Sequence, residues 1–274
     1  MKIGFIDYYL DEWHANHYPA MLREVSGGEM EVTCAYALID GPDGRRTTAE
    51  WCAQMGIDRA ESIEEVIARC DGLIVLSPDD CDMHEQLCQL PLRSGKPTYV
   101  DKTFAPDGET ARRIFAIAQE SATPCYSTSA LRYASEYEGI TGVEGIASWG
   151  PNGFETYAIH QLEPIMMLMQ GRPVRVMAMP GKGWYTMTIA FADGRTATLA
   201  GYDAGSPFMM NLTGRDGAKM IEVKSAYFNR FIEQLVAFFR DPRKIVPHEE
   251  TIAIMDVRGA GIRALAKPGE WIEI

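Results

Sequence analysis

The first 120 residues alternate between short apolar runs and segments with helical spacing, and this alternation constrains the fold more than any other feature. Strands that alternate with helices along a chain build a parallel sheet covered by helices. The sequence therefore predicts an α/β first half. The expected strands are 2–7, 31–39, 72–76 and 97–100, and the expected helices are 17–25, 48–55, 62–69, 83–93 and 107–120.

From about residue 124 the pattern changes, because residues 143–223 hold several β-rich runs separated by glycine turns. The clearest pair, 184–191 and 196–202, is joined through Ala192-Asp193-Gly194, which is typical of a β-hairpin. The runs predict an α+β second half with a mostly antiparallel open sheet covered by helices on one face. The further expected strands are 174–179, 209–212, 219–223 and 271–274, and the expected helices are 157–169, 226–240 and 248–266.

The length of the chain favours two domains. At 274 residues it exceeds the usual size of a single domain, roughly 100–200 residues. The change of pattern places the boundary between a first domain, 1–123, and a second domain, 124–274. The last helix and strand of the second domain are candidates to pack back on the first.

Composition argues against several classes of partner. The chain carries 38 acidic and 26 basic residues, and its formal net charge of −12 repels nucleic acid and anionic lipid at long range. No run approaches the roughly 20 apolar residues of a membrane span, and the N-terminus shows no export signal. Six cysteines stand apart without a C-x-x-C pair. We therefore expect a cytoplasmic protein that binds neither nucleic acid nor membrane.

Four stretches of the chain share the motifs of one enzyme family. Residues 71–79 read DGLIVLSPD and are followed by His84, and residues 95–103 read GKPTYVDKT. Residues 156–163 read TYAIHQLE, and residues 248–274 hold a helix pattern with a closing strand. In this order and spacing they resemble the Gfo/Idh/MocA oxidoreductases over nearly the whole chain. The resemblance implies a Rossmann-like dinucleotide-binding domain followed by an α+β domain for substrate binding and oligomerisation.

By this resemblance the chain is an NAD(P)-dependent oxidoreductase that moves a hydride between a nicotinamide and a sugar, polyol or related hydroxy compound. Lys102 would contact the reacting oxygen, and His160 would exchange its proton. A homo-oligomer, dimer or tetramer, is implied as well. Ligands of doubly wound sheets lie at the carboxyl ends of strands. The residues expected to bind NAD or NADP are Ile6, Asp7, Tyr8, Asp40, Ser77, Pro78, Asp101 and Lys102.

The first βα loop departs from the family pattern. Asp7, Tyr9 and Glu12 stand where the family carries G-x-G-x-x-G. Glycine is needed there because the backbone turns tightly and approaches the pyrophosphate, whose charge rests on N–H groups at a helix terminus. Two carboxylates and a phenol add bulk and repel the diphosphate. A second hypothesis therefore stays open, a degenerate family member that binds a small ligand or a partner without redox turnover.

The candidate residues also have ordinary structural interpretations. Lys102 can be a solvated lysine at a strand end, and Asp40 makes a turn opener with Gly41-Pro42. A lone histidine on an apolar helix, such as His160, is usually structural. If His160 acts in catalysis, a hydrogen bond to Glu163 would orient its ring, since residues three apart share a helix face.

Two further local features bear on the site. Asp11, Glu12, His14 and His17 form a polar cluster, but helix capping is a better interpretation than metal binding, and we predict no metal site. Asp101 and Thr103 stand where the family carries Glu and Pro around the lysine. A cis peptide bond before Thr103 would be costly.

Overall fold

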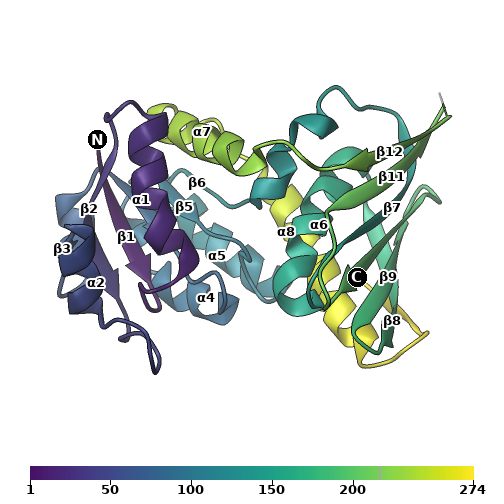
Figure 1. Cartoon of the computed structure of the whole chain (residues 1–274), viewed down its shortest axis with the longest axis horizontal. Coiled ribbons are helices and arrows are strands. Elements are labelled where there is room, and N and C mark those ends of the chain that lie inside the picture. Colours follow the sequence, from purple (N-terminus) through teal and green to yellow (C-terminus); the bar gives the residue numbers. More distant parts are fainter. Residues whose placement is uncertain (216) are drawn as a thin grey trace. The chain divides into compact units, whose positions relative to one another are not determined.

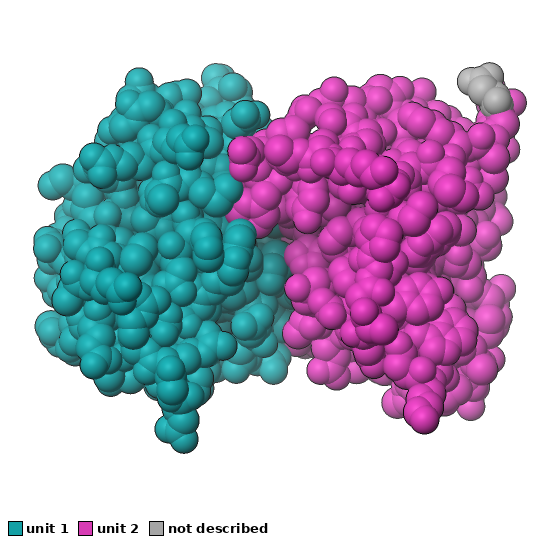
Figure 2. Space-filling model, viewed as in Figure 1, with its two compact units in different colours: residues 1–105, 110–128, 231–248 teal, residues 106–109, 129–230, 249–274 magenta. Residues whose placement is uncertain are grey.

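The computed structural model describes residues 1–215 and 217–274, which form two compact units. Unit 1 comprises residues 1–105, 110–128 and 231–248, and unit 2 comprises residues 106–109, 129–230 and 249–274 (Figure 2). The units are therefore interleaved along the chain, and a stretch near the C-terminus belongs to the same unit as the N-terminus.

Unit 1 is built on a six-stranded parallel sheet with the order β3-β2-β1-β4-β5-β6 (Figure 1). The strand order reverses between β1 and β4, as in doubly wound dinucleotide-binding sheets. Ile3, Phe5 and Ile74 in the central strands are fully buried, which a sheet covered on both faces requires. The predicted parallel α/β sheet is confirmed. The strands are β1 Lys2–Asp7, β2 Glu31–Ala37, β3 Asp58–Arg59, β4 Gly72–Val75, β5 Thr98–Val100 and β6 Cys125–Tyr126.

Helices pack closely on both faces of this sheet. A Cβ atom on Gly4 would lie 2.3 Å from Val66 of α3, and one on Gly72 would lie 2.8 Å from the Phe239 ring of α7. Because Ile3 of β1 pairs with Gly72, Gly4 and Gly72 face opposite sides of the sheet. Helices α3 and α7 therefore cover opposite faces. The helices with all or most of their length in unit 1 are α1 Trp13–Val25, α2 Thr48–Met55, α3 Ile63–Arg69, α4 His84–Leu87, α5 Gly108–Glu120 and α7 Tyr227–Arg240.

Two expected helices of unit 1 differ in the structure. Helix α1 begins at Trp13 instead of residue 17, because the Glu12 side chain caps it. The helix expected over 83–93 is broken into η1 Cys81–Met83, α4 and η2 Pro91–Arg93. Proline lacks the N–H that would continue the helix through this segment.

Unit 2 is built on a seven-stranded sheet with the order β12-β11-β7-β10-β9-β8-β13. Neighbouring strands run antiparallel except for β7 and β10, which are parallel. The predicted mostly antiparallel sheet is therefore confirmed, and β9 and β10 have the bounds expected for the hairpin. The strands are β7 Val143–Pro151, β8 Pro173–Gly181, β9 Trp184–Phe191, β10 Thr196–Tyr202, β11 Met209–Gly214, β12 Gly217–Glu222 and β13 Trp271–Glu273.

Helices α6, Phe154–Met169, and α8, His248–Leu265, pack on one face of this second sheet. The buried Gln161 amide ties α6 to two strands, because it accepts from Ser148 Oγ at 2.8 Å and donates to Ala200 O at 2.9 Å. A Cβ atom on Gly261 of α8 would lie 2.4 Å from the Phe154 ring, so α8 packs tightly against α6. Over the described length of the chain, no helix is long and apolar enough to cross a membrane.

Candidate functional site

The N-terminus of α1 is capped by a carboxylate of its own loop. Glu12 is 4% exposed, and its side chain accepts the backbone N–H groups of His14, at 2.6 Å, and Ala15. N–H groups at the start of a helix have no partner within the helix and attract anions, which is why they hold the diphosphate in dinucleotide-binding folds. Here the side chain of Glu12 occupies that anion position.

Asp7, at the end of β1, is a second buried carboxyl group of this loop. Its Oδ1 accepts the Tyr8 N–H at 2.6 Å, whereas its Oδ2 has no hydrogen-bond partner within the described residues. Burial, and then the charge of Glu12, raise the pKa of Asp7 well above its ordinary value. Burial also raises the pKa of Glu12 to about 7, although the charge of His14 opposes the rise. The loop therefore carries less negative charge near neutral pH than its sequence suggests.

Asp101, just after β5, is fully buried among three polar side chains. Its Oδ2 lies 2.7 Å from His14 Nδ1. Its Oδ1 accepts from the Tyr18 hydroxyl at 3.2 Å and lies 3.1 Å from the Tyr99 hydroxyl. Burial alone would raise the pKa of Asp101. The charge and close contact of His14, together with the charge of Lys102, lower this pKa to about 2. Asp101 is therefore an ionised carboxylate inside a polar network.

The sheet register brings most of the predicted cofactor-binding residues to one edge of unit 1. Ile6 pairs with Val75, and Val75 pairs with Val100, so β1, β4 and β5 end side by side. From the segment after β5, Lys102 Nζ donates to Pro78 O at 3.4 Å. The residues gathered along this edge are Ile6, Asp7, Tyr8, Ser77, Pro78, Asp101 and Lys102.

The loops that follow β4 and β5 are tied together by His84. Its buried ring lies 2.5 Å, through Nε2, from Leu76 O and 3.0 Å, through Nδ1, from Phe104 O. Burial lowers the pKa of His84. The histidine of the family motif therefore has a structural position in this chain. The peptide bond between Lys102 and Thr103 is cis, although a cis bond before a residue other than proline is costly.

Asp40 lies after β2, at another strand end of the same sheet. Its Oδ1 accepts the Thr48 N–H at the start of α2 at 2.8 Å, and the bonds to Thr48 lower the pKa of this exposed carboxyl. Asp40 also lines a cavity of about 190 Å³ with Arg59 and Glu61. Small-molecule pockets are usually about 300–1,000 Å³. Asp40 thus serves as a local capping group beside a small polar cavity.

In unit 2, His160 lies on α6 with an orienting partner that the sequence did not suggest. Its Nδ1 lies 2.7 Å from the hydroxyl of the buried Ser129, and the rings of Tyr157 and Phe208 stand edge-on to it at 5.1 and 5.9 Å. A hydroxyl can either donate to the ring or accept from it, so it orients the imidazole without adding a charge. Ser129 belongs to no motif recognised in the sequence.

Glu163 was the group expected to orient His160, but in the structure its carboxylate pairs with Arg132. Its buried carboxylate accepts from Arg132 Nη1 at 3.0 Å, and Arg132 also pairs with Glu250. Burial raises the pKa of Glu163, and the charge of Arg132 opposes the rise. This ion-pair cluster holds α6, α8 and the turn η3, Ala130–Tyr133, together within unit 2.

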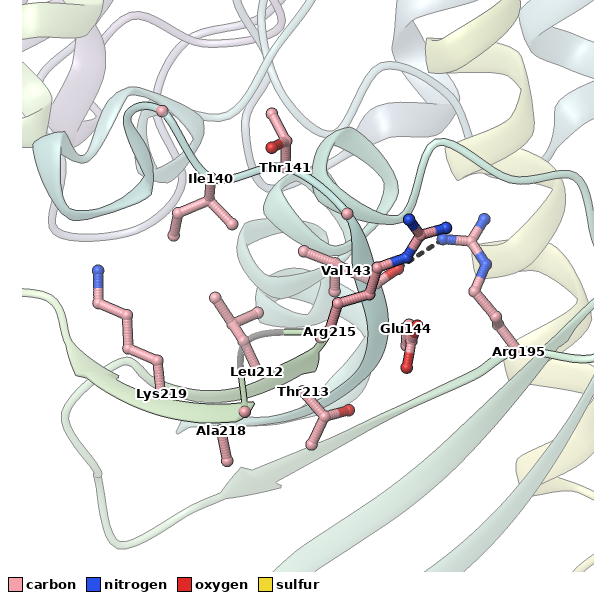
Figure 3. Close-up of a pocket in the computed structure, with 14 residues that line it drawn as sticks. Ile140, Thr141, Val143, Glu144, Arg195, Leu212, Thr213, Arg215, Ala218 and Lys219 are labelled. Carbon is pink, nitrogen blue, oxygen red and sulfur yellow. Dashed lines mark hydrogen bonds between the residues drawn. The ribbon is translucent and has the colours of Figure 1, made fainter.

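A separate cavity of about 830 Å³ lies in unit 2 where the turns of its strands meet (Figure 3). Arg195, Arg215 and Lys219 supply positive charge, and Arg195 Nη1 donates to Val143 O at 2.7 Å, the bond drawn in Figure 3. None of the residues predicted to bind cofactor or to act in catalysis lines this cavity. The candidate site therefore lies elsewhere.

The polar cluster of the first loop is accounted for by capping and packing. Asp11 pairs with Arg46, and the His17 ring stacks on Trp13 with its Nδ1 2.6 Å from Trp13 O. In the parts of the chain that the structure describes, 1–215 and 217–274, no group of three or more His, Cys, Asp or Glu side chains is arranged to hold a metal ion.

No protein-family model matches this chain, and no curated protein matches it in sequence. Its fold, however, matches solved dehydrogenases over their full length. A probable dehydrogenase from Thermotoga maritima has a TM-score of 0.80 at 11% identity, over 100% of this chain and 98% of that chain. A myo-inositol dehydrogenase from Corynebacterium glutamicum has a TM-score of 0.78 at 14% identity, and the match covers 100% of this chain and 98% of that chain. GenD2 from gentamicin A biosynthesis, in complex with NAD, has a TM-score of 0.77 at 12% identity, over 100% and 96%.

The chain therefore has the fold of solved dehydrogenases, which agrees at the level of the fold with the resemblance inferred from the motifs. At identities of 11–15% the likeness does not extend to a specific activity. The chain shares the fold of these proteins, and its function has to be argued from its own side chains.

The fold implies a nicotinamide dinucleotide, but the residues at the start of α1 do not fit its diphosphate. The two N–H groups that would hold the anion already bind Glu12. A diphosphate would have to displace the buried Glu12 side chain from both N–H groups. Asp7, in the same loop, adds a second carboxyl group. No reaction step through a nicotinamide follows from this geometry.

Proposed function

We propose that this chain binds a small neutral hydroxy compound, such as a sugar or polyol, without pyridine-nucleotide redox turnover. The observation that carries the proposal is the Glu12 carboxylate on the first N–H groups of α1. An internal carboxyl group in that place satisfies the N–H groups of the helix terminus and competes with a diphosphate for them. The dehydrogenase fold is kept, but its means of holding the dinucleotide is replaced.

Two observations support a neutral, hydroxyl-rich ligand. The carboxyl edge of the first sheet offers an imidazole at His14 and an ammonium at Lys102, groups that hydrogen-bond hydroxyls. The buried, ionised Asp101 interacts with both groups, and its negative charge disfavours an anionic ligand. A structural neighbour with this fold is named as a myo-inositol dehydrogenase, which supports a polyol as the ligand.

A second candidate is an NAD(P)-dependent oxidoreductase acting on a sugar, polyol or related hydroxy compound. It is favoured by the full-length likeness to dehydrogenases, one of them solved with NAD. Asp40 follows β2, where an acidic residue holds the ribose hydroxyls of NAD in such folds. In this candidate Lys102 and His160 keep the catalytic roles predicted from the resemblance, and a diphosphate has to displace Glu12 or bind along another path.

Titration with nucleotide separates the two candidates. A ligand that binds only the folded chain raises its stability by about 2.7 kcal/mol when present at about 100 times its Kd. We expect no rise in melting temperature with NADH or NADPH up to about 1 mM, and a rise with myo-inositol or glucose. A rise with either nucleotide would overturn the proposal in favour of the oxidoreductase. If no neutral polyol raises the melting temperature, the proposed class of ligand is wrong.

A pair of variants tests the role of Glu12 itself. Glu12→Gly removes the carboxylate and frees the N–H groups of His14 and Ala15. If the carboxylate excludes the dinucleotide, this variant should gain a stabilisation by NADH that the native chain lacks. Glu50→Gly makes the same change at the capping box of α2 and should gain none. Equal responses of the two variants would show that Glu12 is not what excludes the nucleotide.

If NADH does stabilise the native chain, variants test the oxidoreductase in detail. Asp40→Ala should then weaken NADH binding, because it removes the acceptor for the ribose hydroxyls. Lys102→Ala and His160→Ala should reduce turnover far more than cofactor affinity. Turnover that survives both changes would remove these two residues from the mechanism.

We also propose that the chain forms a homo-oligomer, a dimer or tetramer. The second sheet carries exposed aromatic and sulfur side chains, with Trp184 stacked on Tyr202 and with Met179 and Trp271 each more than a third exposed. Exposed apolar surface of this kind favours association. Light scattering on the purified chain measures the mass, and a value of 30.5 kDa would reject the oligomer.

A further inference from the structure

The contact between His14 and Asp101 joins two elements that are far apart in sequence. His14 lies in the first turn of α1, and Asp101 follows β5. Their contact of 2.7 Å puts a carboxylate on one nitrogen of an imidazole at the carboxyl edge of the first sheet, where doubly wound folds bind their ligands. Glu12 Oε2 lies 3.8 Å from the same nitrogen and adds negative potential there.

The carboxylate of this pair is held in place by other groups. Both phenols at Asp101 Oδ1, those of Tyr18 and Tyr99, stay protonated, since burial raises their pKa. The Tyr99 hydroxyl also lies 2.9 Å from Thr128 O, which ties it to the segment after β6. Asp101 is therefore oriented by tyrosines of α1 and β5 and has little freedom to turn away from His14.

A carboxylate on Nδ1 determines the form of a neutral imidazole. The proton stays on Nδ1, facing Asp101, and the lone pair is on Nε2. The same carboxylate stabilises the imidazolium when Nε2 takes up a proton. Within the pair the histidine is the member that solvent reaches, because the side chain of His14 is 11% exposed and that of Asp101 is 1% exposed.

We infer that His14, oriented by Asp101, is an acid–base residue that exchanges a proton with a hydroxyl group of the bound compound. As a base, Nε2 forms an N–H bond while the O–H bond of the ligand breaks and its electron pair stays on the ligand oxygen. The positive charge of the ring is balanced by Asp101. As an acid, His14 returns the same proton. The inference rests on the proposed binding of a hydroxy compound, and it makes Asp101 a positioning residue.

The tautomer of His14 is the first test, and it needs no ligand. The ¹⁵N shifts of histidine-labelled protein distinguish the two neutral forms of the ring. We expect the Nδ1–H form at His14 in the native chain, and a shift toward the Nε2–H form, which free histidine prefers, in Asp101→Asn. An Nε2–H form at His14 in the native chain would overturn the inference.

Access to His14 is the second test. Diethyl pyrocarbonate modifies imidazole nitrogens that small molecules can reach, and mass spectrometry of the peptides separates His14 from His17. We expect both residues to be modified in the native chain, since the inference requires a reachable Nε2. Modification of the exposed His17 with none at His14 would show that the pair is only structural, whatever the variants do.

Protection links the residue to the ligand. A polyol that stabilises the chain should slow the modification of His14 and leave that of His17 unchanged. Equal rates with and without the bound polyol would overturn the role of His14 toward it. The tautomer and the reactivity of His14 are measured on the free protein, so they test the inference without any ligand. The nucleotide and polyol titrations test only the proposed function.

Discussion

Glu12→Gln should make the stability of this chain less dependent on pH between about 4.5 and 7. The ordinary pKa of a glutamate is 4.5, and burial raises that of Glu12 to about 7 in the folded chain. Between these values the folded chain holds a proton at Glu12 that the unfolded chain has released. The stabilisation that this proton linkage provides is complete below about pH 4.5 and is lost as the pH rises through about 7.

The magnitude follows from the two pKa values. At about 1.4 kcal/mol for each pH unit, the gap between 4.5 and about 7 corresponds to about 3 kcal/mol of unfolding free energy. Glutamine keeps one acceptor oxygen for the N–H groups of His14 and Ala15, so part of the cap survives. Loss of the rest of the cap costs about 1 kcal/mol, and this cost is the same at every pH.

Urea unfolding at several pH values between 4 and 8 measures the effect. The native chain should lose stability across the window, with a further contribution from Asp7, whose pKa is also raised by burial. Across the same pH window, Glu12→Gln should lose about 3 kcal/mol less unfolding free energy than the native chain. Glu50→Gln serves as the control, because the bonds to Thr47 lower the pKa of Glu50 and its removal cannot flatten the curve. Parallel curves for the native chain and Glu12→Gln would refute a buried, proton-holding Glu12.

Three further substitutions test the packing around the candidate site, each by the urea midpoint at neutral pH. Gly4→Ala should destabilise the chain by about 1–3 kcal/mol, because the new Cβ would lie 2.3 Å from Val66, and Val66→Ala should relieve part of the loss. Gln161→Leu should cost about 1–3 kcal/mol, because it leaves a carbonyl of β10 without its donor. Arg132→Met should cost about 3–5 kcal/mol, because the buried Glu163 carboxylate loses its ion pair, and adding Glu163→Gln should recover part of the loss. An unchanged urea midpoint in any of the single variants would contradict the contact that it tests.

Much of the fold was predictable because its signals are local. The parallel strands of the first half are short buried runs, and β1 has the expected bounds because every residue from Ile3 to Ile6 is apolar or glycine. The hairpin of β9 and β10 was visible because buried residues alternate with more exposed ones around a glycine turn. The start of α1 was missed, because its cap is a glutamate, a residue less typical of that position than Ser, Thr, Asp or Asn.

The candidate site was predictable only as a place. The motifs pointed to the carboxyl ends of β1, β4 and β5, and the register brings the predicted residues to that edge. The residues that contact the two histidines were not predictable. Ser129 lies 31 positions from His160 in the chain, and Asp101 lies 87 positions from His14. No local pattern specifies such pairs, because they arise from the packing of elements that are distant in sequence.

The sequence by itself determined the alternation of strands and helices in the first half, the two sheet types, and the presence of Asp7, Tyr9 and Glu12 in the first βα loop. These are properties of residue periodicity and residue type, and neither depends on contacts between distant segments. Only the tertiary structure decided that Glu12 takes the anion position of α1 and that Asp101 pairs with His14. Both results depend on burial and on distances of a few ångströms, and these set the charge of a carboxyl group once the chain has folded.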